Sequence, residues 1–323
     1  MKFSYYIFES DSFDPARNLA IEEYLLTKAE NAVILYLWQN ENTVVIGKNQ
    51  NPWMECRTAL LQQEGGTLVR RLSGGGAVFH DLGNLNFTFL VPRDCFDETT
   101  QFSVILEALA ALGIDAEFTG RNDMTVNGRK FSGNAYYRNS RAAYHHGTLM
   151  VDADLEKLGR YLSPSKAKLQ SKGVDSVRSR VVNLKELNPE ITVAALKAAL
   201  IHAFAFLYRT PERLILTKED EEIIDSLTEK YRSWDWTFGR KIPFTLSAEE
   251  RFPWGSIRLE LAADKGIITD VRVFSDAMDD TVAPRLEEAL RNQMLAKESV
   301  HRAIDASVPE FSADLHTVMD AII

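Results

Sequence analysis

The residues of this chain best suited to chemistry lie in one short string between Arg70 and Asn84. The string reads RRLSGGGAVFHDLGN, so two arginines stand just ahead of three consecutive glycines. Arginine neutralises phosphate or carboxylate with paired hydrogen bonds, and glycine lets backbone N–H groups approach an anion closely and adopts positive φ at low steric cost. The string therefore predicts an anion-binding loop. The alternative is a glycine-rich turn with two solvated arginines.

The sequence of this loop does not match the motifs of the two commonest nucleotide-binding loops. The phosphate loop needs a lysine directly after its last glycine, whereas Gly76 is followed by Ala77. The dinucleotide fingerprint needs a glycine where Phe79 stands.

A two-residue hairpin that carries Lys130 is predicted around residues 127 and 128. Asn127-Gly128 is the strongest short signal for a two-residue hairpin turn, and the strands that it predicts cover 124–126 and 129–131. Lys130 is then fixed on a strand rather than carried by a loop. Taken alone, a lysine at this place is more often a surface residue at the shoulder of a hairpin.

Composition limits the class of protein. With 323 residues, 45% hydrophobic and 26% charged, the chain is long enough for two cores and has the balance of a soluble globular protein. A net charge of −9 argues against general nucleic-acid affinity, because polyanion binding depends on phosphate neutralisation. Cys56 and Cys95 give neither a disulfide framework nor metal spacing, and no segment approaches the length of a membrane span. We therefore expect a cytoplasmic protein without a nucleic-acid or membrane partner.

One region departs from the acidic average. Residues 157–185 contain eight lysines and arginines against a single acid, Asp175. Such a run is either a solvated face or a segment that handles anions.

The spacing of apolar residues predicts helices and strands in mixed order. Helical spacing with proline or threonine at the start indicates helices over 15–29, 52–64, 102–112, 155–162 and 193–207. Apolar or alternating runs indicate strands over 33–38, 43–46, 67–72, 85–91 and 147–151, besides the hairpin. This mixture predicts an α+β domain around a mixed or largely antiparallel sheet.

A second, smaller domain is expected at the C-terminal end. We place the boundary between residues 244 and 245, which gives domains of 1–244 and 245–323. The second domain is predicted to hold strands over 256–262 and 267–274, followed by helices over 284–294, 297–304 and 312–322.

The string at 70–84 resembles the signature of the lipoate-protein ligase A family. The resemblance extends through short motifs along most of the chain: 14–15, 22–23, 37–40, 43–47, 51–53, 120–123, 129–135, 145–149, 172–181 and 251–255. It implies a mixed-sheet catalytic domain of the biotin/lipoate ligase type with a small α+β accessory domain. It also implies an enzyme that uses ATP to activate lipoate as lipoyl-AMP and then transfers the lipoyl group to a carrier lysine.

The same resemblance suggests partners and a metal ion. The carriers would be the lipoyl domains of 2-oxoacid dehydrogenase complexes and the glycine cleavage H protein. Because no His, Cys and acid cluster has metal spacing, we expect no protein-bound metal, and Mg²⁺ would arrive with ATP.

The family's functional positions can be carried over residue by residue. The catalytic residues would be Lys130, which would contact both substrates, and Asp123, which would orient it. The ATP-binding residues would be Arg71, Gly76, Ala77, Val78, Phe79 and Lys130. The lipoate-binding residues would be Arg70, Gly75, His80, His146 and again Lys130.

Three other functions remain open at this point. A related octanoyltransferase would need a cysteine nucleophile, and no cysteine follows Lys130 anywhere in the sequence. A biotin ligase would carry a Gly-Arg-Gly-Arg type of loop in place of residues 73–76. A silent lipoate or nucleotide binder would be expected to have lost some of Arg71, Gly76 and Lys130, and all three are present.

Overall fold

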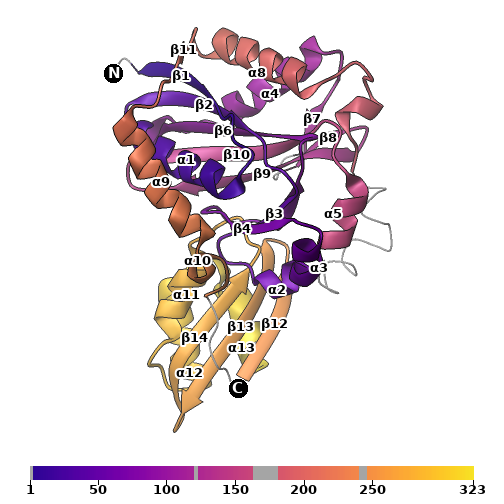
Figure 1. Ribbon diagram of the computed structural model, residues 1–323. Coiled ribbons are helices and arrows are strands. Elements are labelled where there is room, and N and C mark those ends of the chain that lie inside the picture. The colour runs from indigo at the N-terminus through magenta and orange to yellow at the C-terminus, as the bar shows by residue number, and fades with distance from the viewer. Residues whose placement is uncertain (1–2, 120–122, 163–180, 240–245) are drawn as a thin grey trace.

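The molecule has two parts, a larger one around a broad sheet and a smaller one at the C-terminal end of the chain (Figure 1). This computed structural model describes residues 3–119, 123–162, 181–239 and 246–323. No helix within these ranges combines the length and the apolar character that crossing a bilayer requires.

One eight-stranded sheet forms the centre of the larger part. Its strands, in spatial order, are β11 (Glu212–Arg213), β1 (Ser4–Glu9), β2 (Ala32–Trp38), β6 (Asn84–Pro92), β10 (Ala142–Met150), β9 (Arg129–Arg138), β8 (Asp123–Val126) and β7 (Glu117–Phe118). Strand β1 runs parallel to both β2 and β11, whereas the pairs from β2 to β7 are antiparallel. The predicted α+β fold around a mixed sheet is therefore confirmed.

Helices cover both faces of this sheet, which is why β2 is buried along its whole length. The odd-numbered residues of β2 pack with helices α4 (Glu98–Ala111) and α8 (Val193–Leu207). The even-numbered residues pack with α1 (Pro15–Lys28) and α9 (Lys218–Arg232) on the opposite face. Because successive strand residues point to opposite faces, a strand covered on both sides must be apolar at every position.

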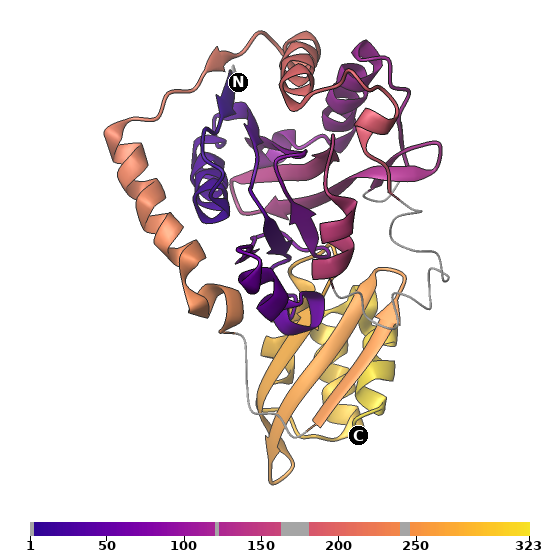
Figure 2. The same ribbon diagram turned by 45° about the vertical axis from the view of Figure 1, so that its right-hand side comes forward.

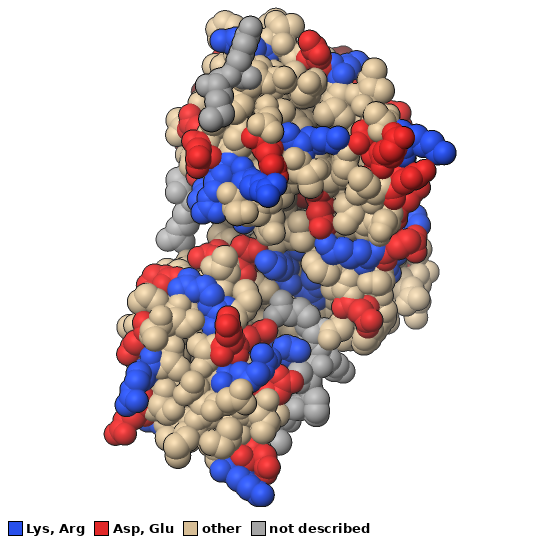
Figure 3. Space-filling view, turned by 90° about the vertical axis from the view of Figure 1, so that its left-hand side faces the viewer, with Lys and Arg blue, Asp and Glu red and all other residues tan. Residues whose placement is uncertain are grey.

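Helix α9 is not predicted by the sequence pattern, because most of its residues are polar. Only a narrow stripe that includes Ile224 and Tyr231 is buried. Charged contacts to α1 add to this packing: Lys230 Nζ lies 2.7 Å from a Glu23 oxygen, and the Tyr231 hydroxyl donates to the same carboxylate. Basic and acidic side chains accordingly lie interspersed on this face of the molecule (Figure 3).

A second, three-stranded sheet carries the arginine–glycine string. Strand β3 (Thr43–Ile46) lies between β4 (Thr67–Arg70), which is parallel to it, and β5 (Val78–His80), which is antiparallel. Residues 71–77 connect β4 to β5 and are called the glycine loop below. Strands β2 and β3, which follow one another in the chain, thus belong to different sheets, and the turn between them carries the chain from one sheet to the other.

Helix starts are predicted more accurately than helix continuity. Asp14 and Thr192 cap their helices as expected, each accepting a hydrogen bond from a following backbone N–H at 3.0 Å. The single helix predicted over 52–64 is wrong: two short helices, α2 (Pro52–Glu55) and α3 (Thr58–Gln63), are separated at Cys56, which forms an isolated bridge with another segment. The other short helical segments among the described residues of the larger part are α5 (Leu155–Tyr161), α10 (Trp234–Phe238), Arg93–Cys95 and Leu184–Glu186.

The smaller part is an antiparallel sheet backed by helices on one face (Figure 2). Strands β12 (Leu246–Phe252), β13 (Gly255–Asp264) and β14 (Ile267–Ser275) are followed by α11 (Val282–Leu290), α12 (Lys297–Ser307), the turn Pro309–Phe311 and α13 (Ser312–Asp320). These elements enclose a hydrophobic core of their own. Strand β12 was not predicted. The domain boundary at 244/245 falls beside residues 240–245, which lie outside the described residues, and it stays a prediction.

The two parts meet at the glycine loop. The Gly75 N–H donates to the Ala277 carbonyl at 2.9 Å, and the Ser275 N–H donates to the Asn49 carbonyl at 2.9 Å. An ion pair between Lys48 and Asp280, 2.8 Å apart, lies beside these bonds. The segment that follows β14 therefore rests directly on the loop singled out from the sequence.

A methyl group at residue 74 should loosen this contact. The Cβ of Gly74→Ala would lie 2.4 Å from the Ala277 carbonyl oxygen, so one backbone must shift, at a cost of about 1–3 kcal/mol. We expect a lower melting temperature by calorimetry and faster amide exchange around residue 277. Gly159→Ala in α5 is the matched control, because its Cβ would meet no atom within 4 Å. Equal melting temperatures for the two variants would contradict the contact.

Candidate active site

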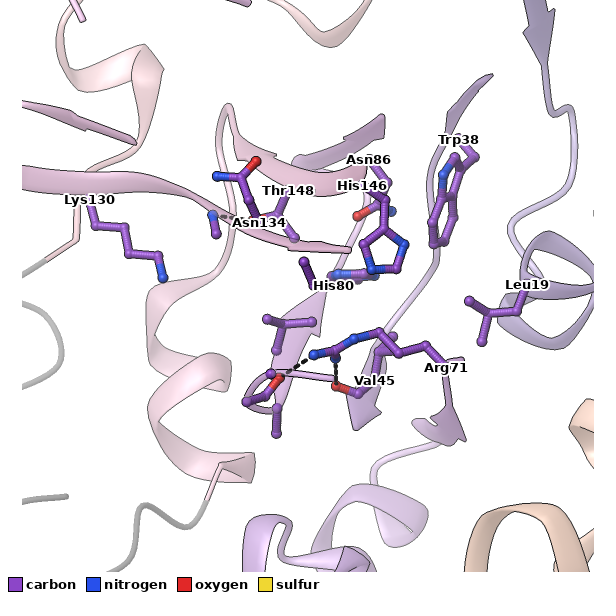
Figure 4. Close-up of a pocket in the computed structure, with 17 residues that line it drawn as sticks. Leu19, Trp38, Val45, Arg71, His80, Asn86, Lys130, Asn134, His146 and Thr148 are labelled. Carbon is purple, nitrogen blue, oxygen red and sulfur yellow. Dashed lines mark hydrogen bonds between the residues drawn. The ribbon is translucent and has the colours of Figure 1, made fainter. Parts of the chain in front are cut away.

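The glycine loop closes one side of a cavity of about 120 Å³. Strands β6, β9 and β10 of the main sheet form the opposite side, and residues of α1, β2, β3 and β5 complete the wall. Lys130 lies at one end of the cavity and Leu19 at the other, with His80 and His146 between them (Figure 4). A mostly apolar wall with a few converging polar groups is typical of a small-molecule site.

Arg71 shapes the glycine loop from inside. Its guanidinium donates to the carbonyl oxygens of Gly76 and Val45 at 2.8 and 3.2 Å (Figure 4). It also donates to the Gly74 carbonyl at 2.6 Å and to the Ser73 hydroxyl at 3.0 Å. The side chain is buried, and this desolvation lowers the pKa of Arg71 to about 10. Arg71 therefore stays charged at neutral pH and lines the cavity. Its predicted contact with the nucleotide stays a prediction.

Arg70 points away from the cavity and does not line it. Its guanidinium is buried and donates to five backbone carbonyls, three in the turn 47–50 and two in α10, at Trp236 and Thr237. The Trp236 indole donates back to the Arg70 carbonyl at 2.8 Å. This placement gives Arg70 a structural role and does not favour the predicted contact with lipoate.

A chain of hydrogen bonds connects α1 to the glycine loop through His146. The Ser73 Oγ lies 2.8 Å from His146 Nε2, and His146 Nδ1 lies 2.8 Å from a Glu22 oxygen. All three side chains are buried, and Thr88 also donates to the Glu22 carboxylate. Because both ring nitrogens of His146 are occupied, the predicted lipoate contact of His146 would involve the face or edge of its ring.

His80 has an unused donor beside the cavity. Its Nδ1 lies 3.2 Å from the Asn40 amide nitrogen, which makes Nδ1 the acceptor and leaves the proton on Nε2. Within the described residues, buried Nε2 has no hydrogen-bond partner. Burial, followed by the charges of Arg71 and His146, lowers the pKa of His80 to about 3, so the ring is neutral at pH 7.

Lys130 is held at the mouth of the cavity by a carboxylate on the neighbouring strand. The φ angles of Asn127 and Gly128, 51° and 74°, confirm the predicted two-residue turn and place Lys130 on β9. Its Nζ lies 2.6 Å from Asp123 Oδ1, and the Lys130 side chain is 36% exposed. The amine is thus positioned but still open to a ligand.

The other loop residues predicted from the sequence divide into two groups. Gly75, Gly76, Ala77 and Val78 line the cavity, and Gly75 has the positive φ of 84° that favours glycine. Phe79 does not line it, because its buried ring packs against Tyr161.

Comparisons with known proteins identify the family. Residues 14–205 match the family model described as lipoyl protein ligase A/B catalytic domain, and residues 241–317 match the bacterial lipoate protein ligase C-terminus. The lipoate-protein ligase A of Psychrobacter cryohalolentis is 40% identical over 98% of this chain and 97% of its own length. The chain belongs to the lipoate-protein ligase A family.

Solved structures of related proteins share the fold. P. falciparum LipL1, solved in complex with lipoate, has a TM-score of 0.84 and 28% identity over 97% of this chain and 98% of its own. A lipoate-protein ligase A bound with ATP has a TM-score of 0.64 and 26% identity over 74% of this chain and 99% of its own. The bi-partite ligase of Thermoplasma acidophilum, described together with its E2 lipoyl domain, has a TM-score of 0.66 and 26% identity over 76% of this chain and all of its own. The resemblance inferred from the sequence is therefore confirmed.

Several cavity residues of this family member were not singled out from the sequence. Trp38 and Asn86 come from neighbouring strands of the main sheet, and Thr148 accepts a hydrogen bond from the Gly133 N–H at 3.2 Å. Glu22, which fixes His146, lies on the buried side of α1. Glu22, Trp38 and Thr148 lie in the family motifs at 22–23, 37–40 and 145–149, whereas for Asn86 the signal was a polar residue within an apolar strand.

The basic stretch predicted to handle anions lies mostly outside the described residues, which omit 163–180. Of its described members, Arg160 pairs with Glu64, and Lys185 pairs with Asp152 at 2.6 Å. Elsewhere in the described ranges, no group of three or more His, Cys, Asp or Glu side chains is arranged to hold a metal ion.

The protonation state of His80 gives a pH-dependent stability. Because the folded pKa is about 3, the unfolded state takes up a proton that the folded state excludes as the pH falls below about 6.5. Stability is thus lost toward acid, with a slope of about 1.4 kcal/mol per pH unit per proton. His80→Asn should reduce this slope by one proton in urea titrations between pH 6 and 4, and His202→Asn on an exposed face of α8 is the control. An unchanged slope in His80→Asn would show that His80 is protonated in the fold.

Proposed function

We propose that the protein is an ATP-dependent lipoate ligase that forms lipoyl-AMP and transfers the lipoyl group to a carrier lysine. The observation that carries this proposal is the position of the Lys130 amine, which Asp123 holds at the mouth of an apolar cavity beside Gly76. An apolar cavity suits an acyl chain, and an ammonium at its mouth suits a carboxylate and a phosphate. The related structures bound to lipoate and to ATP support the same two ligands.

The first step joins lipoate to the nucleotide. A lipoate carboxylate oxygen attacks the α-phosphorus of ATP, the bond from that phosphorus to the bridging oxygen breaks, and pyrophosphate leaves. The two reacting groups are both anions, and the Lys130 ammonium between them reduces their repulsion and stabilises the developing charge. The backbone of residues 76–79 would hold the adenine. Magnesium would enter on the nucleotide phosphates, for which it is the usual counterion.

The second step transfers the acyl group. The ε-amine of a carrier lysine attacks the carbonyl carbon of the mixed anhydride, an amide forms, and AMP leaves with the electrons of the broken carbon–oxygen bond. The open side of Lys130 allows a carrier side chain to reach this carbonyl. Lipoyl domains of 2-oxoacid dehydrogenase complexes and the glycine cleavage H protein are the proposed carriers. The structure described with an E2 lipoyl domain supports the first of these.

The positions of the cysteines do not support the octanoyltransferase alternative. That reaction needs a reactive thiolate at the acyl cavity. Cys56 is buried, and desolvation raises its pKa to about 11. Cys95 is exposed, and neither cysteine lines the cavity at Lys130.

Pyrophosphate exchange tests the proposal. With lipoate and Mg-ATP the protein should exchange labelled pyrophosphate into ATP, which neither a thioester transferase nor a silent binder does. Lys130→Ala should reduce the exchange rate about 100- to 1,000-fold, the loss typical of removing a group that stabilises developing charge. Lys185→Ala, which removes a surface lysine paired with Asp152, is the matched control. Exchange at an undiminished rate in Lys130→Ala would refute the role of the amine.

Gly133 offers a milder change at the same amine. A Cβ at residue 133 would lie 3.0 Å from Lys130 Nζ and 3.2 Å from its Cε, so Gly133→Ala should displace the amine while the flexible lysine absorbs the crowding. We expect a melting temperature close to that of the parent and exchange reduced about 10- to 100-fold, because small misplacements of a catalytic group are costly. Unchanged exchange in a folded Gly133→Ala protein would mean that the position of the amine is not critical.

A further inference from the structure

A second, larger cavity lies between the two parts of the molecule and shares two residues with the first. Its volume is about 870 Å³, and Gly76 and Lys130 line both cavities. The two cavities therefore adjoin at Gly76 and Lys130. If the proposed function holds, lipoate fills the smaller cavity and the nucleotide extends into the larger one.

The far wall of this interdomain cavity comes from the smaller part of the molecule and carries Arg251. Arg251 lies near the end of β12, in register with Ser256 on β13, and its side chain is 21% exposed. The segment after β14 also lines the cavity and is fixed to the glycine loop by the bond from Gly75 to Ala277. Arg251 and Lys130 therefore line the same cavity from different parts of the molecule.

The charged residues that line the cavity are two cations, Lys130 and Arg251, and three carboxylates, Asp123, Asp276 and Asp279. Lys130 is engaged by Asp123 at 2.6 Å. Asp279, another cavity residue, accepts hydrogen bonds from the backbone N–H and hydroxyl of Thr281 at 2.9 and 2.7 Å. These two acids are thus already engaged by neighbouring groups.

The carboxylate nearest to Arg251 binds it only loosely. Asp276 uses one oxygen for the backbone N–H and hydroxyl of Ser256, at 2.7 and 2.8 Å, and its other oxygen lies 3.4 Å from Arg251 Nη1. Within the described residues this is the single hydrogen bond of the guanidinium, whereas Arg291 in the same part holds Asp270 at 3.1 Å. Most of the Arg251 donors can therefore turn to a ligand.

We infer that Arg251 binds the β- and γ-phosphates of the nucleotide and stabilises the departing pyrophosphate. When the carboxylate attacks, the bond between the α-phosphorus and the bridging oxygen breaks, and the negative charge grows on that oxygen. A guanidinium binds such oxygens in pairs and keeps its proton. Lys130 then binds the α-phosphate from one wall of the cavity, and Arg251 binds the leaving pyrophosphate from the other. The site is therefore complete only with both parts of the molecule.

The inference separates the two half-reactions. Arg251→Ala should raise the KM for ATP and lower pyrophosphate exchange, together by roughly 10- to 100-fold, as expected for the loss of charge-assisted hydrogen bonds. The KM for lipoate and the transfer from preformed lipoyl-AMP to a lipoyl domain should stay unchanged, because pyrophosphate takes no part in them. Arg251→Lys should recover part of the loss. Arg291→Ala, which removes an arginine of the same part outside the cavity, should behave as the parent.

Three other results of these assays would contradict the inference or the proposed function. If Arg251→Ala exchanges pyrophosphate at the rate of the parent, the inference is wrong. If exchange and transfer fall together, or if the melting temperature falls with them, Arg251 is structural and the inference is also wrong. If the folded parent protein does not exchange pyrophosphate, the proposed function is wrong. This result differs from a failure of the Arg251 inference, because it is seen without any substitution.

Discussion

A buried guanidinium determines the conformation of the glycine loop. Removing the Arg71 charge from water is costly, and the cost is offset only when its N–H groups find acceptors. The loop supplies them through the carbonyls of Gly74 and Gly76 and the Ser73 hydroxyl. The backbone of the glycine loop therefore wraps around one cation. This cation holds the loop in a single conformation beside the cavity.

The glycine loop also contacts the smaller part of the molecule. This contact explains the glycines of the loop better than anion binding alone does. A side chain at residue 74 would collide with the Ala277 carbonyl, while Gly75 combines a positive φ with a backbone bond to that carbonyl. Across the loop, a Cβ at Gly47 would lie 2.3 Å from the Gly75 oxygen. The glycines therefore allow three backbone segments to approach one another, and the loop couples the cavity to the domain contact.

Local signals in the sequence predicted local structure well. The Asn127-Gly128 turn, the Asp14 and Thr192 caps and the position of Lys130 on a strand follow from interactions within a few residues, and all are confirmed. Arg70 and Arg71 are adjacent and equally basic, so no local rule separates them. Their different surroundings arise because β4 ends at Arg70, which contacts α10, far away in the sequence, whereas Arg71 already belongs to the glycine loop. The helix α9 and the contact with Ala277 depend on similarly distant partners.

The acid–base chemistry of lysine and arginine explains which of the two is buried in this site and which lies near solvent. Burial favours the neutral form of a base, and a lysine loses its proton in a dry interior far more readily than an arginine does. The buried position beneath the loop is accordingly filled by Arg71, whose pKa falls only to about 10. Lys130 lies at the mouth, where its side chain is 36% exposed and its Nζ is 2.6 Å from Asp123 Oδ1. The arginine of this site is therefore the buried cation, and the lysine is the one that remains near solvent.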